Sequence, residues 1–116
     1  MNIDYRNLLR QYFQFFSAKD STSLAKMFAK DIVLMDWDIR SVGKDNVLNE
    51  VMRIFASVDT IDITLISFFI GLHNTFAAHI SISLDGKEAI HVIDTFEFNH
   101  GGKILMINAF KYIDFL

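Results

Sequence analysis

The sequence of 116 residues contains no cysteine and no proline, and it has only five glycines. Without cysteine the chain can form no disulfide bond, zinc ribbon or iron–sulfur centre, and it has no thiol nucleophile. Without proline, its turns must be built by Gly, Asn and Asp. Charged residues are also sparse, at 22% against 52% hydrophobic residues, a balance that excludes a disordered chain.

The basic residues do not cluster in the sequence. The 11 Lys and Arg residues are scattered, and the formal net charge is −3, so we expect no nucleic-acid partner. Phenylalanine is unusually frequent, with 12 copies, which predicts a core or cavity built from rings. A chain of this length forms one domain, residues 1–116, and can bury about two-thirds of its surface.

Residues 63–84 contain no Asp, Glu, Lys or Arg and are long enough to span a bilayer. From Phe76 to Leu84, however, large apolar residues alternate with small or polar ones, and a period of two is typical of a strand. We therefore expect two strands joined near Gly71–Asn74, and no membrane association. Three charged side chains among the first ten residues interrupt the apolar run that a signal peptide needs, so we expect a cytoplasmic protein.

Periodicity along the chain predicts helices first and then a meander of strands. Residues 3–17 carry an apolar stripe at helical spacing, and the later segments alternate with a period of two. The predicted helices are 3–17, a short helix capped by Asp20 or Ser21, and 44–55; the predicted strands are 31–38, 61–70, 75–85, 88–98 and 104–113, with turns at Val42–Lys44, Asp85-Gly86 and Asn99–Gly102. The order α-α-β-α-β-β-β-β predicts an α+β fold, with the helices packed on one face of a curved antiparallel sheet.

Three polar side chains fall on apolar faces of these elements. In the strand 88–98, Asp94 shares a face with Val92 and two Phe rings, where an unpaired carboxylate costs several kcal/mol, so it should pair or keep its proton. Asp36 follows two aliphatic residues on one face of the strand 31–38. Tyr12 lies on the apolar stripe of the first helix, where its hydroxyl needs a partner. One cavity between helices and sheet could collect all three.

Each of these residues also has a structural explanation when it is taken alone. Tyr12 suits a core or rim position, and Asp36 and its neighbour Asp38 suit a solvated strand end. Asp94 suits a buried acid that is hydrogen-bonded or paired with a helix. The functional hypothesis therefore depends on the three side chains coming together.

The sequence resembles the nuclear transport factor 2-like superfamily, within it the SnoaL-like group, and most closely the Δ5-3-ketosteroid isomerases. The similar segments cover nearly the whole chain; they are Arg10-Gln11-Tyr12, Met27–Asp31 leading to a strand that ends near Asp36, Gly43 at the third helix, Ile93–Asn99, and Gly102-Lys103. The resemblance implies a cystatin-like cone, in which a curved antiparallel sheet wraps three helices around an apolar pocket. It also implies a homodimer formed through the sheet.

In the ketosteroid isomerases an Asp at the end of the first strand is the general base, and a Tyr and a protonated Asp donate hydrogen bonds to the developing oxyanion. The resemblance assigns these roles to Asp36, Tyr12 and Asp94, in a reaction that moves a double bond of a small apolar carbonyl compound through an enolate. It implies no cofactor and no metal. The chain departs from those isomerases at Trp37, where they commonly have Pro, and at Val51, where many have a second Tyr.

Other functions stay open on this sequence. One is a SnoaL-type cyclase that uses Asp94 alone as acid and base, a second is a non-catalytic domain that binds an apolar ligand, and a third is an interaction module that docks through its sheet. An epoxide hydrolase of this fold needs an Arg between two pocket acids, but all four Arg precede the strand meander. A dehydratase pairs His with Asp, whereas His79 and His91 lie off the apolar faces. The substrate would depend on rings such as Phe55, Phe69, Phe76 and Phe96.

Overall fold

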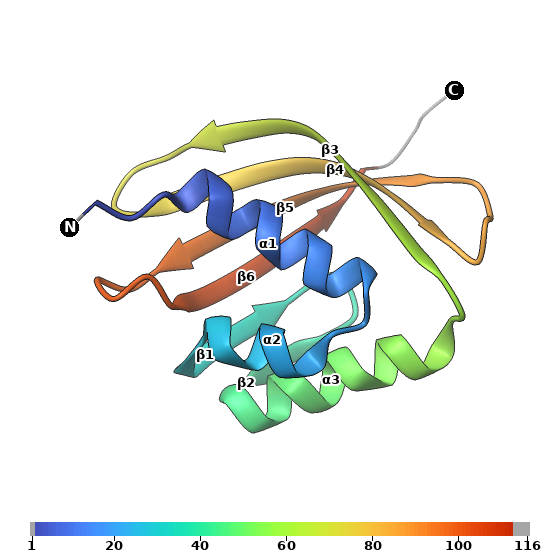
Figure 1. Cartoon of the computed structure of the whole chain (residues 1–116), viewed down its shortest axis with the longest axis horizontal. Coiled ribbons are helices and arrows are strands. Elements are labelled where there is room, and N and C mark those ends of the chain that lie inside the picture. Colours follow the sequence, from blue (N-terminus) through green and yellow to red (C-terminus); the bar gives the residue numbers. More distant parts are fainter. Residues whose placement is uncertain (1, 113–116) are drawn as a thin grey trace.

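Three helices cover one face of a six-stranded sheet in the computed structural model, which describes residues 2–112 (Figure 1). The helices are α1 (Tyr5–Ser17), α2 (Ser21–Met27) and α3 (Lys44–Ser57). The strands are β1 (Phe28–Met35), β2 (Arg40–Val42), β3 (Ile61–Ile70), β4 (Thr75–Leu84), β5 (Ile90–Phe98) and β6 (Ile104–Lys111). The predicted α+β class, with helices packed on a curved sheet, is confirmed.

Side chains at the helix starts explain where the first two helices begin. The Asp4 carboxylate accepts a hydrogen bond from the Asn7 backbone N–H at 3.1 Å, and the Asp20 carboxylate accepts one from the Ser23 N–H at 3.0 Å. Both bonds satisfy first-turn N–H groups that have no partner within the helix. Ahead of α3, Gly43 has a φ of 90°, a conformation that favours glycine because it has no Cβ.

The strand order across the sheet is β2-β1-β6-β5-β4-β3. The sequence predicts a curved antiparallel sheet; four of the five strand pairs are antiparallel, but β1 and β6 run parallel, so the sheet is mixed. Alternation within a strand shows which side chains share a face and says nothing about the direction of the neighbouring strand. The β1–β6 pair joins segments about 70 residues apart, and no turn sequence between them fixes their relative direction.

The predicted strand 31–38 is displaced, because β1 begins at Phe28 and ends at Met35. The strand ends where Asp36 Oδ1 accepts hydrogen bonds from the backbone N–H groups of Asp38 and Ile39, each at 2.7 Å. Asp and Asn commonly close a turn in this way. After the turn the chain runs back along β1 as β2, a three-residue strand too short to show alternation in the sequence.

The Asp85-Gly86 turn is confirmed, since both residues have positive φ angles, 55° and 70°. The following strand β5 begins at Ile90 instead of the predicted residue 88. Asp85 Oδ1 accepts hydrogen bonds from the N–H groups of Asp59 and Thr60, at 2.6 and 2.9 Å. The turn is thereby held against the chain segment that leads into β3.

Residues 63–84 form most of β3 and all of β4, as alternation predicts. Across residues 2–112, none of the helices combines the length and the apolar character needed to cross a membrane. The last predicted strand, 104–113, is confirmed as β6 up to Lys111, and its residue 113 lies outside the described residues.

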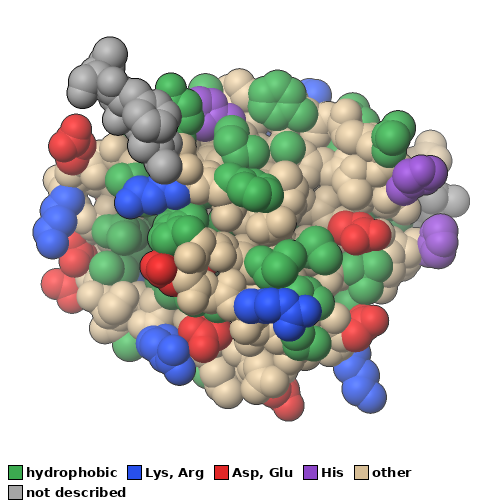
Figure 2. Space-filling view, turned by 180° about the vertical axis from the view of Figure 1, so that it is seen from behind, with side chains coloured by type: hydrophobic (Ala, Val, Ile, Leu, Met, Phe, Trp, Pro, Cys, Tyr) green, Lys and Arg blue, Asp and Glu red, His purple; other side chains and the backbone are tan. Residues whose placement is uncertain are grey.

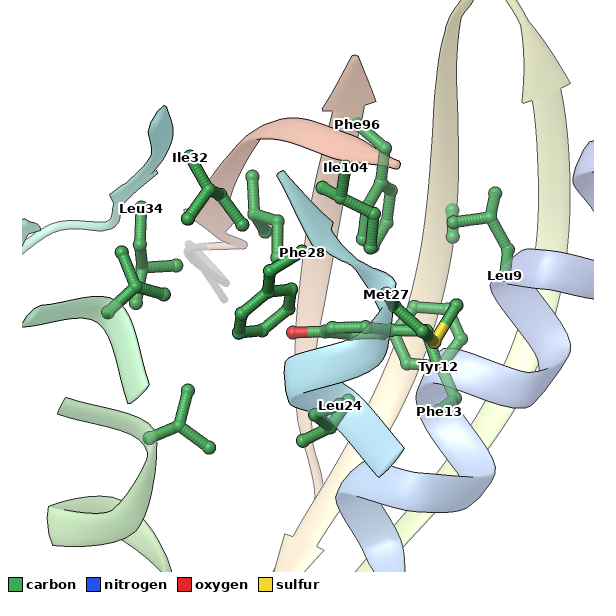
Figure 3. Close-up of a cluster of buried hydrophobic side chains, with 14 of the residues drawn as sticks. Leu9, Tyr12, Phe13, Leu24, Met27, Phe28, Ile32, Leu34, Phe96 and Ile104 are labelled. Carbon is green, nitrogen blue, oxygen red and sulfur yellow. The ribbon is translucent and has the colours of Figure 1, made fainter. Parts of the chain in front are cut away.

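The core lies between the helices and the inner face of the sheet (Figure 3). Leu9 of α1, Leu24 of α2 and Ile32 of β1 are completely enclosed, and Phe96 of β5 is 1% exposed. Burying side chains of this size contributes roughly 1.5–3 kcal/mol each. All three helices contribute to this core, α3 through Val47, Val51 and Phe55.

Candidate active site

A cavity of about 340 Å³ lies between α1, α3 and the inner face of the sheet. Its volume falls at the lower end of the range for small-molecule sites. Most of the lining is aliphatic, and the polar members are Tyr12, Asp36, Asp38, Ser57 and Asp94. The cavity is therefore an apolar hollow with a few polar groups, the composition typical of a ligand site.

Tyr12, Asp36 and Asp94 all line this one cavity, so the fold brings together the three residues that the sequence analysis selected. They come from α1, from the turn after β1 and from β5. In α1 the helical repeat places Leu9, Tyr12 and Phe13 on the buried side. The Tyr12 ring extends away from α1 with its hydroxyl oxygen at the far end (Figure 3).

Strand register explains why Asp36 and Asp94 face the same space. In one inward-facing row Leu34, Ile107 and Phe96 are partners across β1, β6 and β5. The next inward-facing row contains Ala109, two residues after Ile107 on β6, and its partner Asp94, two residues before Phe96 on β5. Asp36 lies at the end of the same row, two residues after Leu34. The small Ala109 side chain thus lies between two carboxyl groups, and the cavity has room there.

Asp94 is a buried acid, with 8% of its surface exposed. Burial first, and then the negative charge of Asp36, raise the pKa of Asp94 from its ordinary 3.8 to about 7. Among residues 2–112, every side-chain nitrogen or oxygen that is fully enclosed has a hydrogen-bond partner. Since no side-chain bond to the Asp94 carboxyl exists within that part of the chain, its oxygens face the open space of the cavity.

Tyr12 is also buried, and burial followed by the charge of Asp94 raises the pKa of its hydroxyl well above its ordinary range. The hydroxyl is therefore a neutral hydrogen-bond donor at any physiological pH. Edge-on contacts hold the ring in place, with centroid distances of 5.2 Å to both Phe13 and Phe96. This packing fixes the position of the hydroxyl oxygen before any ligand binds.

Asp36 differs from the other two because it is only half-buried and its orientation is fixed by the backbone. Its Oδ1 is used by the two N–H groups of the turn, while its Oδ2 accepts no hydrogen bond from residues 2–112. An oxygen that is held in direction and unpaired is suited to accept a proton from a bound molecule. Asp36 is thus a residue of the cavity wall, and not simply a solvated acid at a strand end.

Several lining residues were not predicted from the sequence, and the four phenylalanines that were expected to shape the substrate site lie elsewhere. Trp37 and Ile39, on the turn after β1, and Ser57, at the end of α3, line the cavity. Phe55, Phe69, Phe76 and Phe96 do not line it: Phe69 is exposed, and the other three are packed in the core. The turn could have been found from Asp36 and Asp38 together, since closely spaced Asp residues at a strand end favour a turn.

The two histidines nearest the middle of the sheet lie on its outer side, away from the cavity. His79 Nε2 and His91 Nδ1 are 2.9 Å apart, and both residues alternate with inward-facing neighbours on β4 and β5. Residues 2–112 contain no group of three or more His, Asp or Glu placed to hold a metal ion. The polar side chains available for chemistry in the cavity are therefore Tyr12, Asp36 and Asp94, together with Asp38 and Ser57, the other polar side chains of the lining.

These three groups can act together on a carbonyl compound. The Tyr12 hydroxyl and a protonated Asp94 are both donors, and donors directed at one oxygen stabilise negative charge that develops there. Asp36 is a half-buried acid whose free oxygen can accept a proton and return it. Two carboxyl groups in different surroundings can thereby take opposite roles in one site.

Comparisons with known proteins agree with the fold and the family expected from the sequence. Residues 9–107 match the model of the family described as SnoaL-like domain. An NTF2-like protein of unknown function from Cytophaga hutchinsonii has a TM-score of 0.78 and 12% identity, with 97% of this chain and 93% of that chain covered. A Kribbella flavida protein described as a putative ketosteroid isomerase has a TM-score of 0.81 and 17% identity, with 97% and 80% covered.

At such low identities the two structures show a shared fold alone, and none of the curated proteins matches this chain significantly. The family match carries more weight, because it extends from the middle of α1 to the middle of β6. The protein belongs to the SnoaL-like domain family.

Proposed function

We propose that this protein is an isomerase that moves a double bond of a small apolar carbonyl compound by proton transfer through an enolate. The observation that carries the proposal is the single cavity lined by Tyr12, Asp36 and Asp94, in which the pKa of Asp94 is raised to about 7. A neutral acid, a neutral phenol and a second carboxyl group are the set that enolate chemistry needs.

In the proposed reaction the substrate carbonyl oxygen lies against the Tyr12 hydroxyl and the protonated Asp94. Asp36 Oδ2 removes a proton from the carbon next to the carbonyl, and the electron pair moves onto the oxygen to give a dienolate. The two donors stabilise the negative oxygen. Asp36 then returns the proton to the carbon at the far end of the conjugated system, and the double bond has moved without any net change in composition.

The test is the conversion of a β,γ-unsaturated ketone to its conjugated isomer, followed by ultraviolet absorbance. Asp36→Asn should lower kcat by roughly 10²–10⁴-fold, the usual contribution of a general base. Tyr12→Phe and Asp94→Asn should each weaken the binding of planar phenols, which resemble the enolate. Asp62→Asn, on the exposed face of β3, is the matched control and should leave both measurements unchanged.

The competing acid on the same turn is Asp38, which also lines the cavity. If Asp38→Asn abolishes turnover and Asp36→Asn does not, the assignment of the base is wrong. If wild-type protein neither converts the ketone nor binds phenols in a saturable way, the isomerase proposal is wrong as a whole.

A cyclase is the second candidate, supported by the depth at which Asp94 is buried compared with Asp36. It would use Asp94 alone as both acid and base, so Asp94→Asn should abolish its turnover while Asp36→Asn leaves it in place. A domain that only binds an apolar ligand would bind phenols with saturation and convert no ketone. The two substitutions and the two assays together separate the three candidates.

We also propose that two copies associate through the outer face of the sheet. Ile93 of β5 and Phe110 of β6 are cross-strand partners, and both alternate with inward-facing residues, so they point away from the cavity. Phe110 is 52% exposed. Hydrophobic side chains gather over this side of the molecule among scattered charged groups (Figure 2). An apolar outer face of this kind favours coverage by a partner.

A further inference from the structure

The opening of the cavity can be located from the exposure of its lining. Nearly all of the lining residues are buried or half-buried, and the exposed ones are Trp37, Asp38 and Ser57. Two of these are on the turn 36–39 and the third is in the last turn of α3. The cavity therefore opens between the turn 36–39 and the C-terminal end of α3.

Trp37 lines a second, more open hollow in addition to the cavity. That hollow is lined by Asp36, Trp37 and residues 108–112. The two hollows share Asp36, Trp37 and Ala109, and the Trp37 indole is the one large side chain of the three. The boundary between the two hollows thus includes an aromatic ring with half of its surface exposed.

The backbone that carries this ring is fixed, while half of the surface of the ring is open to solvent. Asp36 closes the turn through its carboxylate and through its own N–H, which donates to Ile39 O at 2.9 Å. The indole is contacted by the Lys111 ammonium, which lies 5.9 Å from the ring centroid. A cation–π contact at an exposed site is weak, and the solvent-exposed half of the ring leaves it room to turn about its side-chain bonds.

Charge restricts what can pass this ring. The lining contains the carboxyl groups of Asp36, Asp38 and Asp94 and, within residues 2–112, no Lys, Arg or His. Lys111, which contacts the Trp37 ring, lines the outer hollow and not the cavity. Transfer of an anion into an apolar space that already holds carboxyl groups is strongly unfavourable.

We propose that Trp37 is the specificity-determining residue of the cavity: its indole is a movable wall that admits planar, uncharged ring compounds and stacks on them once they are bound. The inference rests on the proposed function in one respect, because the carbonyl end of the ligand is taken to lie at Tyr12 and Asp94. It adds the class of molecule selected, and it assigns a role to a residue that the proposed chemistry does not use.

The test uses 2-acetylnaphthalene, a planar uncharged aryl ketone, and 2-naphthoate, which has the same two rings and a carboxylate. Binding to the wild-type chain is followed by quenching of tryptophan fluorescence, and Trp37 is the single tryptophan. Isothermal titration calorimetry measures the same ligands with Trp37→Phe, which keeps a ring, and Trp37→Leu, which keeps apolar bulk without one. Phe69→Leu is the matched control, because Phe69 is 53% exposed and lies outside the cavity lining.

The expected result is that Trp37→Leu raises the Kd of 2-acetylnaphthalene by about tenfold, the loss of one aromatic stacking contact, while Trp37→Phe and Phe69→Leu change it by less than about threefold. In the wild type, 2-naphthoate should bind at least about tenfold more weakly than the ketone. Lys111→Met should accelerate association and dissociation of the ketone together by roughly two- to fivefold, since the contact that holds the ring is removed.

Two results would overturn this inference, and they differ in what they say about the proposed function. If Tyr12→Phe weakens ketone binding and Trp37→Leu does not, the ligand lies in the cavity, the proposed function stands, and Trp37 is not its specificity determinant. If the wild-type chain binds neither ligand while the circular dichroism spectrum shows a folded protein, the ligand cavity itself is wrong, and both proposals fall.

Discussion

Asp94 and Ala109 are cross-strand partners on β5 and β6, and both side chains face the cavity. On its other side Asp94 is the partner of Ala78 on β4, which is completely buried and does not line the cavity. The buried carboxyl is thus flanked by two alanines in the same row of the sheet. One faces empty space and the other faces packed core, and this difference makes them a matched pair for substitution.

Ala109→Leu should weaken ligand binding and leave the fold intact. The added atoms enter the space between Asp36 and Asp94, where nothing is displaced, so the free energy of unfolding should change by less than about 1 kcal/mol. The affinity for 2-acetylnaphthalene should fall by more than about tenfold, because the carbonyl can no longer reach the Asp94 carboxyl. Urea unfolding and calorimetry measure the two effects separately.

Ala78→Leu is the control for that experiment. Its side chain meets close-packed core, and overpacking of this kind costs typically 1–3 kcal/mol. The variant should therefore unfold at a lower urea concentration than Ala109→Leu does. Equal destabilisation by the two substitutions would contradict the cavity beside Ala109.

Asp94 should make the protein more stable in mild acid than at neutral pH. The pKa of this carboxyl is about 7 in the folded chain, against its ordinary value of 3.8, which applies in the unfolded chain. Between these two pH values the folded protein keeps a proton that the unfolded chain releases. The stabilisation is complete below about pH 4 and is lost as the pH rises to about 7. A shift of this size corresponds to roughly 4 kcal/mol.

The measurement is the difference in unfolding free energy between wild type and Asp94→Asn from pH 4 to pH 8. The difference removes other acids from the comparison, including Asp20 and Asp85, whose pKa values are lowered by hydrogen bonds and which act in the opposite direction. The unfolding free energy of Asp94→Asn should rise relative to that of the wild type as the pH increases, because the variant has no buried carboxyl group that must become charged. Parallel curves for the two proteins would contradict a raised pKa at Asp94.

The sequence predicted the positions of the inward-facing residues better than it predicted the ends of the elements. A period of two in residues 88–98 is a local property, so Asp94 could be assigned to an apolar face without any knowledge of its neighbours. The same holds for Tyr12 on the helical stripe. Both assignments needed only the repeat of the element that carries the residue.

Features that depend on distant segments could not be predicted in this way. The parallel pairing of β1 with β6 joins two ends of the chain, and the three-residue strand β2 exists because β1 is beside it. Trp37 was noted as a departure from the isomerases, yet its place in the cavity wall follows from the Asp36 turn and from the end of α3. Whether a cavity remains depends on how completely many side chains fill a volume, and no local pattern records that.

Asp36→Asn and Asp36→Ala should differ in stability and agree in activity. Asparagine keeps an oxygen that can accept the N–H groups of Asp38 and Ile39, whereas alanine leaves both without a partner. The alanine variant should lose about 1–2 kcal/mol of unfolding free energy relative to the asparagine variant. Both should lose isomerase turnover, because neither has a carboxylate, and this agreement separates the chemical role of Asp36 from its role in the turn.

Phe110→Asp should convert a dimer to a monomer without changing the cavity. The substitution puts a charge in the middle of the proposed interface, and an unpaired charge buried between two copies is strongly unfavourable. In sedimentation experiments the wild type should have twice the 13.4 kDa mass of the chain, and the variant should have the single mass. Met52→Asp is the control, because Met52 is 45% exposed on α3, which packs on the opposite side of the sheet. A wild-type chain that sediments as a monomer at all concentrations would remove the interface, and it would leave the cavity and its three polar groups as they are.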